Sequence, residues 1–164
     1  MLTALVHARS TPEALAFSLS ALVPAVAEGL VSHAVVILGA ERSSTERIAD
    51  AMGATVLVPS AEPWCEAARI ARGDWVLLLD AGEIPDHGWI GVVERHLLQQ
   101  SSNRQRPAVL PKAGLLGRIR EHGSLYLGRS SLRSGLIAAR EPVSKGQIGG
   151  LPVVLGGTRS RLAD

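Results

Sequence analysis

The chain is poor in the residues that form cross-links and large aromatic cores. Its 164 residues include a single cysteine, Cys65, and aromatic side chains make up only 3% of the sequence. One cysteine excludes an internal disulfide and a metal cage built from several thiolates. The lack of disulfides favours a reducing compartment. Because Phe, Tyr and Trp are scarce, the core must consist mainly of Leu, Val, Ile and Ala.

Long hydrophobic runs are also lacking. The longest apolar region, residues 30–40, is broken by a serine and a histidine and is far shorter than the roughly 20 residues of a membrane-spanning helix. The apolar start, residues 1–6, is too short for a secretory signal and is followed by His7 and Arg9. We therefore expect a cytoplasmic protein, with peripheral contact at the inner face of the membrane as a second expectation. The length and the 46% hydrophobic content suit a single folded domain.

The net charge of +2 hides an asymmetry along the chain. Residues 1–102 carry 6 Lys or Arg against 12 Asp or Glu, whereas residues 103–164 carry 11 against 3. The basic segment favours contact with a diphosphate, a membrane surface or lipid-linked acceptor, a nucleic acid, or the acidic half of its own chain. Nucleic acid is not expected, because the segment has one aromatic residue and no recognisable reader motif. A basic face of this segment would consist of Arg118, Arg120, Arg129 and Arg133. Such a face would contact an acidic lipid or a diphosphate, or it would simply be solvated.

Strands and helices are expected to alternate through the first hundred residues. Continuous apolar runs predict strands at residues 2–6, 34–38, 55–58 and 75–79. Between and after them, helical spacing and capping residues predict helices from residue 12, at 43–52, at 63–72 and at 86–100. Strands that are apolar on both faces are typical of a parallel sheet covered on both sides. The expected fold class is therefore α/β: a Rossmann-like, mostly parallel sheet in three α/β/α layers.

The remainder, residues 101–164, is interpreted as a short basic extension of the same domain. Short apolar runs at 108–110, 125–127 and 136–139 predict small strands that close the sheet edge. The last twenty residues contain five glycines and no periodicity, so an extended tail is expected.

The strand that ends at Asp80 draws attention to one edge of the sheet. The stretch "GDWVLLLDAGEIPDHGWI" places Asp80, Gly82 and Glu83 directly after an apolar run. Ligands of such sheets bind outside the carboxyl ends of the strands. Each acid also has an interpretation that needs no ligand. Asp80 would hydrogen-bond to local backbone groups in the turn, and Glu83 would be a solvated turn residue. Asp86 is expected to cap the next helix.

The same stretch, "ARGDWVLLLDAGEIPDHGW", preceded by "ADAMGATVLV", resembles the nucleotide-binding half of the family 2 glycosyltransferases. These GT-A fold enzymes move a sugar from a nucleotide-diphosphate donor. The resemblance covers about residues 3–95 and implies that residues 1–100 form a nucleotide-binding half. Asp80 falls on the first aspartate of the family's Asp-X-Asp motif. A nucleotide-diphosphate sugar is therefore the expected partner.

The resemblance and the strand ends together define the candidate site. Arg9 would clamp a phosphate, and the loop that opens at Gly39 would offer backbone donors ahead of a helix. Mg²⁺ or Mn²⁺, the expected cofactor, would bridge the phosphates through carboxylate oxygens. The metal ligands would be Asp80 and Glu83. The nucleotide-sugar-binding residues would be His7, Arg9, Gly39, Asp80 and Ala81.

Several positions depart from the family pattern. Gly82 replaces the second motif aspartate, and Leu38 and Gly39 stand where the family has paired aspartates. Beyond residue 102 the only carboxylates are Glu121, Glu141 and Asp164, so no catalytic base is assigned. Two hypotheses stay open: a glycosyltransferase-like protein with an unknown acceptor, and a non-catalytic GT-A-fold interaction module. A nucleotidyltransferase-like protein is a third. Open sheet edges would favour a homodimer.

Overall fold

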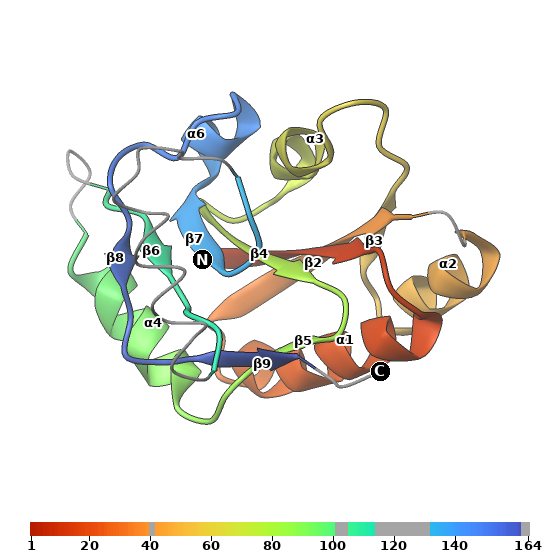
Figure 1. Cartoon of the computed structure of the whole chain (residues 1–164), viewed down its shortest axis with the longest axis horizontal. Coiled ribbons are helices and arrows are strands. Elements are labelled where there is room, and N and C mark those ends of the chain that lie inside the picture. Colours follow the sequence, from red (N-terminus) through yellow and green to blue (C-terminus); the bar gives the residue numbers. More distant parts are fainter. Residues whose placement is uncertain (40–41, 101–104, 114–131, 162–164) are drawn as a thin grey trace.

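The computed structural model describes residues 1–39, 42–100, 105–113 and 132–161. In these residues helices cover both faces of a seven-stranded mixed sheet (Figure 1), which confirms the expected three-layer α/β fold. The strands of this sheet, in spatial order, are β3 (Thr55–Leu57), β2 (Val31–Leu38), β1 (Leu2–Ala8), β4 (Trp75–Asp80), β7 (Leu136–Ala139), β6 (Ala108–Val109) and β8 (Val153–Val154). A second, two-stranded sheet pairs β5 (Glu83–Pro85) with β9 (Arg159–Arg161). The helices are α1 (Pro12–Ala27), α2 (Arg42–Ala51), α3 (Pro63–Ile70), α4 (Trp89–Leu98) and α6 (Arg140–Ser144).

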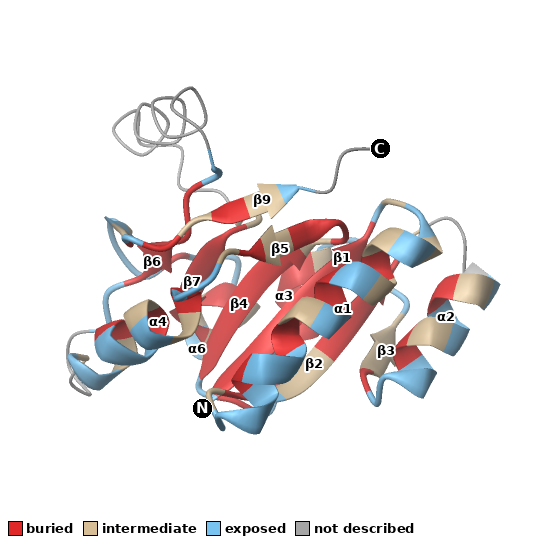
Figure 2. Ribbon diagram, turned by 90° about the horizontal axis from the view of Figure 1, so that it is seen from below, coloured by how far each residue is buried: buried red, intermediate tan, exposed pale blue. Residues whose placement is uncertain are grey.

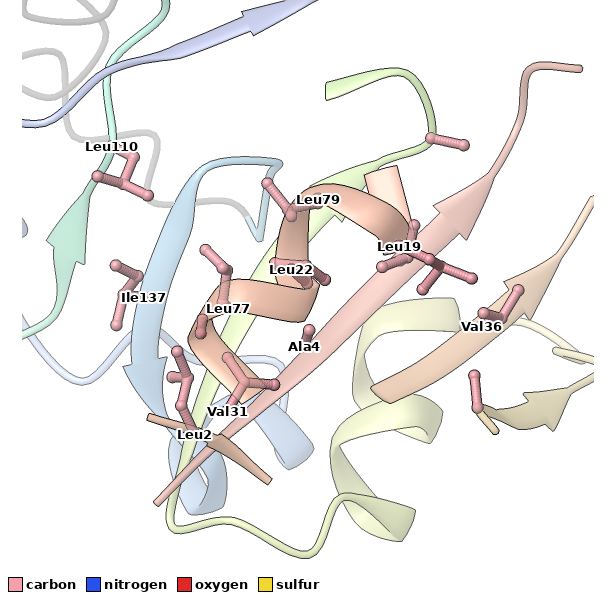
Figure 3. Close-up of a cluster of buried hydrophobic side chains, with 14 of the residues drawn as sticks. Leu2, Ala4, Leu19, Leu22, Val31, Val36, Leu77, Leu79, Leu110 and Ile137 are labelled. Carbon is pink, nitrogen blue, oxygen red and sulfur yellow. The ribbon is translucent and has the colours of Figure 1, made fainter. Parts of the chain in front are cut away.

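The first four strands of the large sheet run parallel, with β1 between β2 and β4. Side chains alternate between its two faces, so each strand contributes to two cores. On one face, leucines and valines of β1, β2 and β4 pack with α1 (Figure 3). On the other face the partners come from α3 and α6. Burial on both faces (Figure 2) accounts for the uninterrupted apolar runs of these strands.

Local signals set most helix starts correctly. Thr11 is the N-cap of α1, where its side chain accepts a hydrogen bond from the Ala14 amide, and Pro12 is the first helical residue. The fourth helix begins at Trp89 instead of at residue 86, and its N-cap is Gly88, in a left-handed conformation with φ 85°. Asp86 does not cap it, because its carboxylate accepts hydrogen bonds from the Thr158 and Ser160 hydroxyls instead. None of the helices in the described ranges combines the length and apolar character needed to cross a bilayer.

The C-terminal extension completes the sheet, as expected. β7 lies antiparallel to β4, and β6 and β8 follow at the edge. Sequence reasoning missed α6, β8 and β9, all of which are short. The strand expected at residues 125–127 and the side chains of Arg118, Arg120 and Arg129 lie outside the described residues. The tail is extended at β9, but it is held against the body by its pairing with β5 (Figure 1).

Ser18 ties α1 to the turn that follows β4. Its side chain is fully buried, and its hydroxyl donates to the Glu83 carbonyl and accepts from the Gly82 amide, each at 2.9 Å. Both backbone groups lie in the interior, where an unpaired polar group is costly. This hydroxyl therefore helps to position the Asp80–Glu83 turn.

We expect Ser18→Ala to lower the free energy of unfolding by about 1–3 kcal/mol, because it removes the hydroxyl that donates to the Glu83 carbonyl. The Gly82 amide keeps its second acceptor, the Ala14 carbonyl at 3.1 Å. Urea denaturation followed by circular dichroism measures the change. Ser20→Ala, at an exposed position on the same helix, is the matched control and should have little effect. Equal stability of the two variants would contradict the bridging role.

Candidate functional site

His7 and Asp80 lie side by side where two neighbouring strands end. The register of β1 and β4 pairs His7 with Asp80. Arg9 follows two residues later, and its Nε donates a hydrogen bond to His7 Nδ1 at 3.0 Å. The Trp64 ring of α3 meets the imidazole edge-on, with 5.4 Å between ring centroids. The strand ends thus gather an imidazole, a guanidinium and a carboxylate.

The electrostatics of this cluster favour a neutral imidazole. Burial lowers the pKa of His7, the nearby Arg9 charge lowers it further, and the Asp80 carboxylate opposes both. The net shift is downward from the usual value of 6.5. A neutral ring with a free Nδ1 lone pair is the form that can accept the Arg9 hydrogen bond.

Asp80 presents one carboxylate oxygen without a partner. Its Oδ1 is buried and has no hydrogen-bond partner among the described residues. Its backbone amide is held by the Glu83 carboxylate and by the Ser134 hydroxyl, each at 3.2 Å. Because a carboxylate oxygen has two lone pairs, Oδ1 can accept a hydrogen bond from a ligand hydroxyl or coordinate a cation.

Gly39 and Ala81 bring the neighbouring backbone close to this cluster. A Cβ on Gly39 would lie 2.2 Å from the Ala8 carbonyl oxygen, so only glycine allows the end of β2 to approach β1 so closely. Ala81 is fully buried, and its amide donates to the His7 carbonyl at 2.9 Å. The structure therefore places the five expected ligand-binding residues at one edge. The remainder of the expected anion loop includes residues 40 and 41, which lie outside the described residues.

The expectation that Glu83 is a solvated turn residue is wrong, because it is only 1% exposed. Its Oε2 lies 3.2 Å from Nε of the equally buried Arg159. The same oxygen accepts hydrogen bonds from the Ser134 hydroxyl and the Asp80 amide. Oε1 lies 4.0 Å from Lys112 Nζ. The carboxylate is thus surrounded by donors that the chain itself supplies.

This donor set does not fit a divalent cation held by the protein's own side chains. Within the ranges that the structure describes, no group of three or more His, Cys, Asp or Glu is arranged to hold a metal ion. Gly82 offers no side chain, and Glu83 is committed to Arg159. Mg²⁺ and Mn²⁺ prefer several oxygen ligands, and of the described carboxylates at these strand ends only that of Asp80 has an available oxygen. Metal binding by Asp80 and Glu83 remains a prediction.

Sequence reasoning missed the residues that enclose Glu83. Arg159, Lys112 and Ser134 come from three separate segments of the C-terminal extension, and no motif marks them. The only sequence signal for these contacts was the charge asymmetry, from which the acidic half of the chain was predicted as one possible partner of the basic segment. The Glu83/Arg159 pair is a contact of that kind.

A separate hollow of about 630 Å³ lies between the start of α1 and the helix α2. Its lining includes Pro12, Glu13 and Arg47 but none of the expected site residues. We do not assign it to the same site.

Comparisons with known proteins identify the fold. No family model matches the sequence, and no curated protein matches it. Among solved structures, the chain is similar to glucosyl-3-phosphoglycerate synthase from Mycobacterium tuberculosis in complex with Mn²⁺, UDP and glucosyl-3-phosphoglycerate. The TM-score is 0.67 at 19% identity, over 100% of this chain and 72% of that chain. The complex of the synthase with Mn²⁺ and UDP-glucose gives a TM-score of 0.65 at 19% identity, with the same coverage. A structure described only as a mycobacterial protein gives 0.63 at 19% identity, over 100% of this chain and 68% of that one. The likeness confirms the expected GT-A-like fold.

We expect Arg159→Met to lower the free energy of unfolding by about 3–5 kcal/mol, because it leaves Glu83 buried without its charged partner. Urea denaturation measures this loss. Arg161→Met changes an exposed arginine of the same strand and should stay within about 1 kcal/mol of the wild type. If Arg159→Met were as stable as Arg161→Met, the ion pair would not hold the tail.

The lowered pKa of His7 predicts a pH dependence. At pH values between the pKa of His7 in the folded chain and its usual value of 6.5, the unfolded chain binds more protons than the folded chain. The free energy of unfolding therefore rises with pH in this window, and this stability is lost as the pH falls below 6.5. We expect His7→Gln to flatten this slope between about pH 5 and 8, which urea denaturation at several pH values measures. His33, whose pKa is also lowered, retains part of the slope in that variant. His87→Gln, at an exposed position, should leave the slope unchanged. A His7→Gln slope equal to that of the wild type would rule out this assignment.

Proposed function

We propose that the chain is a glycosyltransferase-like protein of the family 2 type that binds a nucleotide-diphosphate sugar at the carboxyl ends of β1, β2 and β4. The observation that carries the proposal is the meeting of His7, Arg9 and Asp80 at the ligand-binding edge of a GT-A-like sheet. The solved structures of similar fold support it, since their complexes contain UDP or UDP-glucose with Mn²⁺ or Mg²⁺.

Each residue of the cluster has a role that its chemistry suits. Arg9 is exposed, and a guanidinium can donate two parallel hydrogen bonds to a phosphate. The unpartnered Oδ1 of Asp80 would accept a ribose or sugar hydroxyl. The neutral His7 ring contacts Trp64 and Arg9, and it would lie beneath the ligand between Arg9 and Asp80. In this proposal residues 1–100 form the nucleotide-binding half.

Glycosyl transfer to an acceptor is the reaction class that this fold and ligand suggest. The described residues beyond position 100 include one carboxylate, Glu141, whose Oε1 lies 2.6 Å from Lys145 Nζ in an exposed pair on α6. A catalytic base is therefore not assigned. The second candidate is a non-catalytic module of the same fold that binds the nucleotide sugar or a protein partner. Gly82 in place of an acid and the enclosure of Glu83 favour it.

The first experiment is isothermal titration calorimetry with UDP-, GDP- and TDP-sugars, with and without Mn²⁺. We expect at least one donor to bind. Asp80→Asn should weaken that donor about tenfold, because it removes a charged acceptor from a ligand hydrogen bond.

Asp74→Asn is the matched control, since Asp74 is exposed, directly precedes β4 and faces the opposite edge of the sheet. It should bind the donor as the wild type does. The absence of binding by every donor in both conditions would refute the proposed function.

A further inference from the structure

The buried carboxylate at the candidate site already has a cation, and that cation belongs to the protein. Glu83 and Arg159 are each 2% exposed at the side chain, and Nε of Arg159 lies 3.2 Å from Oε2 of Glu83. The guanidinium is fixed from its other side as well, because it donates to the carbonyls of Leu110 and Ser134. A guanidinium thus pairs with Glu83, three residues after the motif aspartate Asp80.

Further cations surround this pair on the solvent side. Lys112 is half exposed, with its ammonium group 4.0 Å from Glu83. Arg161 is opposite Glu83 in the pairing of β5 with β9, and it reaches across to donate to the Ser10 hydroxyl at 3.3 Å. Arg9 directly precedes that serine in the chain, one residue past the end of β1. Figure 2 shows β9 beside β5 near the start of α1.

The carboxylates at the same edge are mostly engaged. Glu83 is enclosed, and Asp86 accepts hydrogen bonds from the hydroxyls of Thr158 and Ser160. Among the carboxylates that the structure describes at this edge, Asp80 alone keeps a buried oxygen without a partner. Because Arg159 is buried and its charge is offset by Glu83, the solvent-facing cations at this edge are Arg9, Lys112 and Arg161. Among the described residues of the edge, Asp80 is the one carboxylate with an available oxygen.

We propose that this chain neutralises the diphosphate of its ligand with these cationic side chains and needs no divalent metal to bind it. The inference rests on the proposed function, which supplies the diphosphate. A metal does two things for a diphosphate: it offsets charge and it fixes geometry. Arginine and lysine offset the same charge, and a guanidinium also fixes the geometry of phosphate oxygens through paired hydrogen bonds.

The test is calorimetric titration of the full chain with UDP, GDP and TDP, first in EDTA and then in Mn²⁺. Lys112 and Arg161 are the exposed cations beside Glu83, and we call Lys112→Gln and Arg161→Gln the rim variants. Because both positions are exposed, these variants should leave folding intact. Lys145→Gln and Arg69→Gln serve as controls, because they remove one positive charge each from an exposed position, Lys145 at the C-cap of α6 and Arg69 within α3.

We expect at least one nucleotide to bind in EDTA as tightly as in Mn²⁺. Each rim variant should lose about tenfold in affinity for that nucleotide, the effect of one charged hydrogen bond, and the controls should lose nothing. Binding in Mn²⁺ alone would overturn the inference and leave the proposed function standing. Binding in EDTA that the rim variants do not weaken would also overturn it. No binding in either condition would refute the proposed function itself.

Discussion

The enclosed pair of Glu83 and Arg159 is the constraint on which the candidate site depends. Taking two charges out of water costs several kcal/mol for each ion, so such a pair persists only when other hydrogen bonds satisfy it. Here those bonds come from the Asp80 amide, from Ser134 and from the Leu110 carbonyl. The pair therefore fixes the end of β4 and the strand β9 relative to each other.

The backbone at Gly135 passes very close to the guanidinium of Arg159. Gly135 has a φ of 84°, and a Cβ at this position would lie 2.1 Å from an Arg159 nitrogen. A glycine in this conformation lets the chain pass directly over the buried arginine. The Gly135 amide in turn donates to the Leu78 carbonyl, and its carbonyl accepts from the Leu110 amide. The buried cation thus lies where β4 contacts the residue that follows β6 and the residue that precedes β7.

The sequence predicted what local physics determines. Uninterrupted apolar runs predicted the parallel strands because both faces of the sheet are covered, and Thr11 with Pro12 predicted the start of α1 because capping is local. His7 and Asp80 were found by the same logic, since parallel strands end at one edge. Glu83 was misread because a glutamate in a turn is usually exposed, whereas its partner Arg159 lies 76 positions further along the chain. Asp86 was misread for the same reason: nothing near it in the sequence signals Thr158 and Ser160.

The placement of Arg159 has a consequence for the order in which the protein matures. β1, β2 and β4 lie within the first half of the chain and can pair while the remainder is still being synthesised. Glu83 then lacks its buried counter-charge until position 159 emerges. Lys112 is synthesised earlier but is half exposed and 4.0 Å away, so the carboxylate must stay hydrated and the turn after β4 must stay loose. The turn after β4 would therefore acquire its final form only after β9 has been synthesised and has paired with β5.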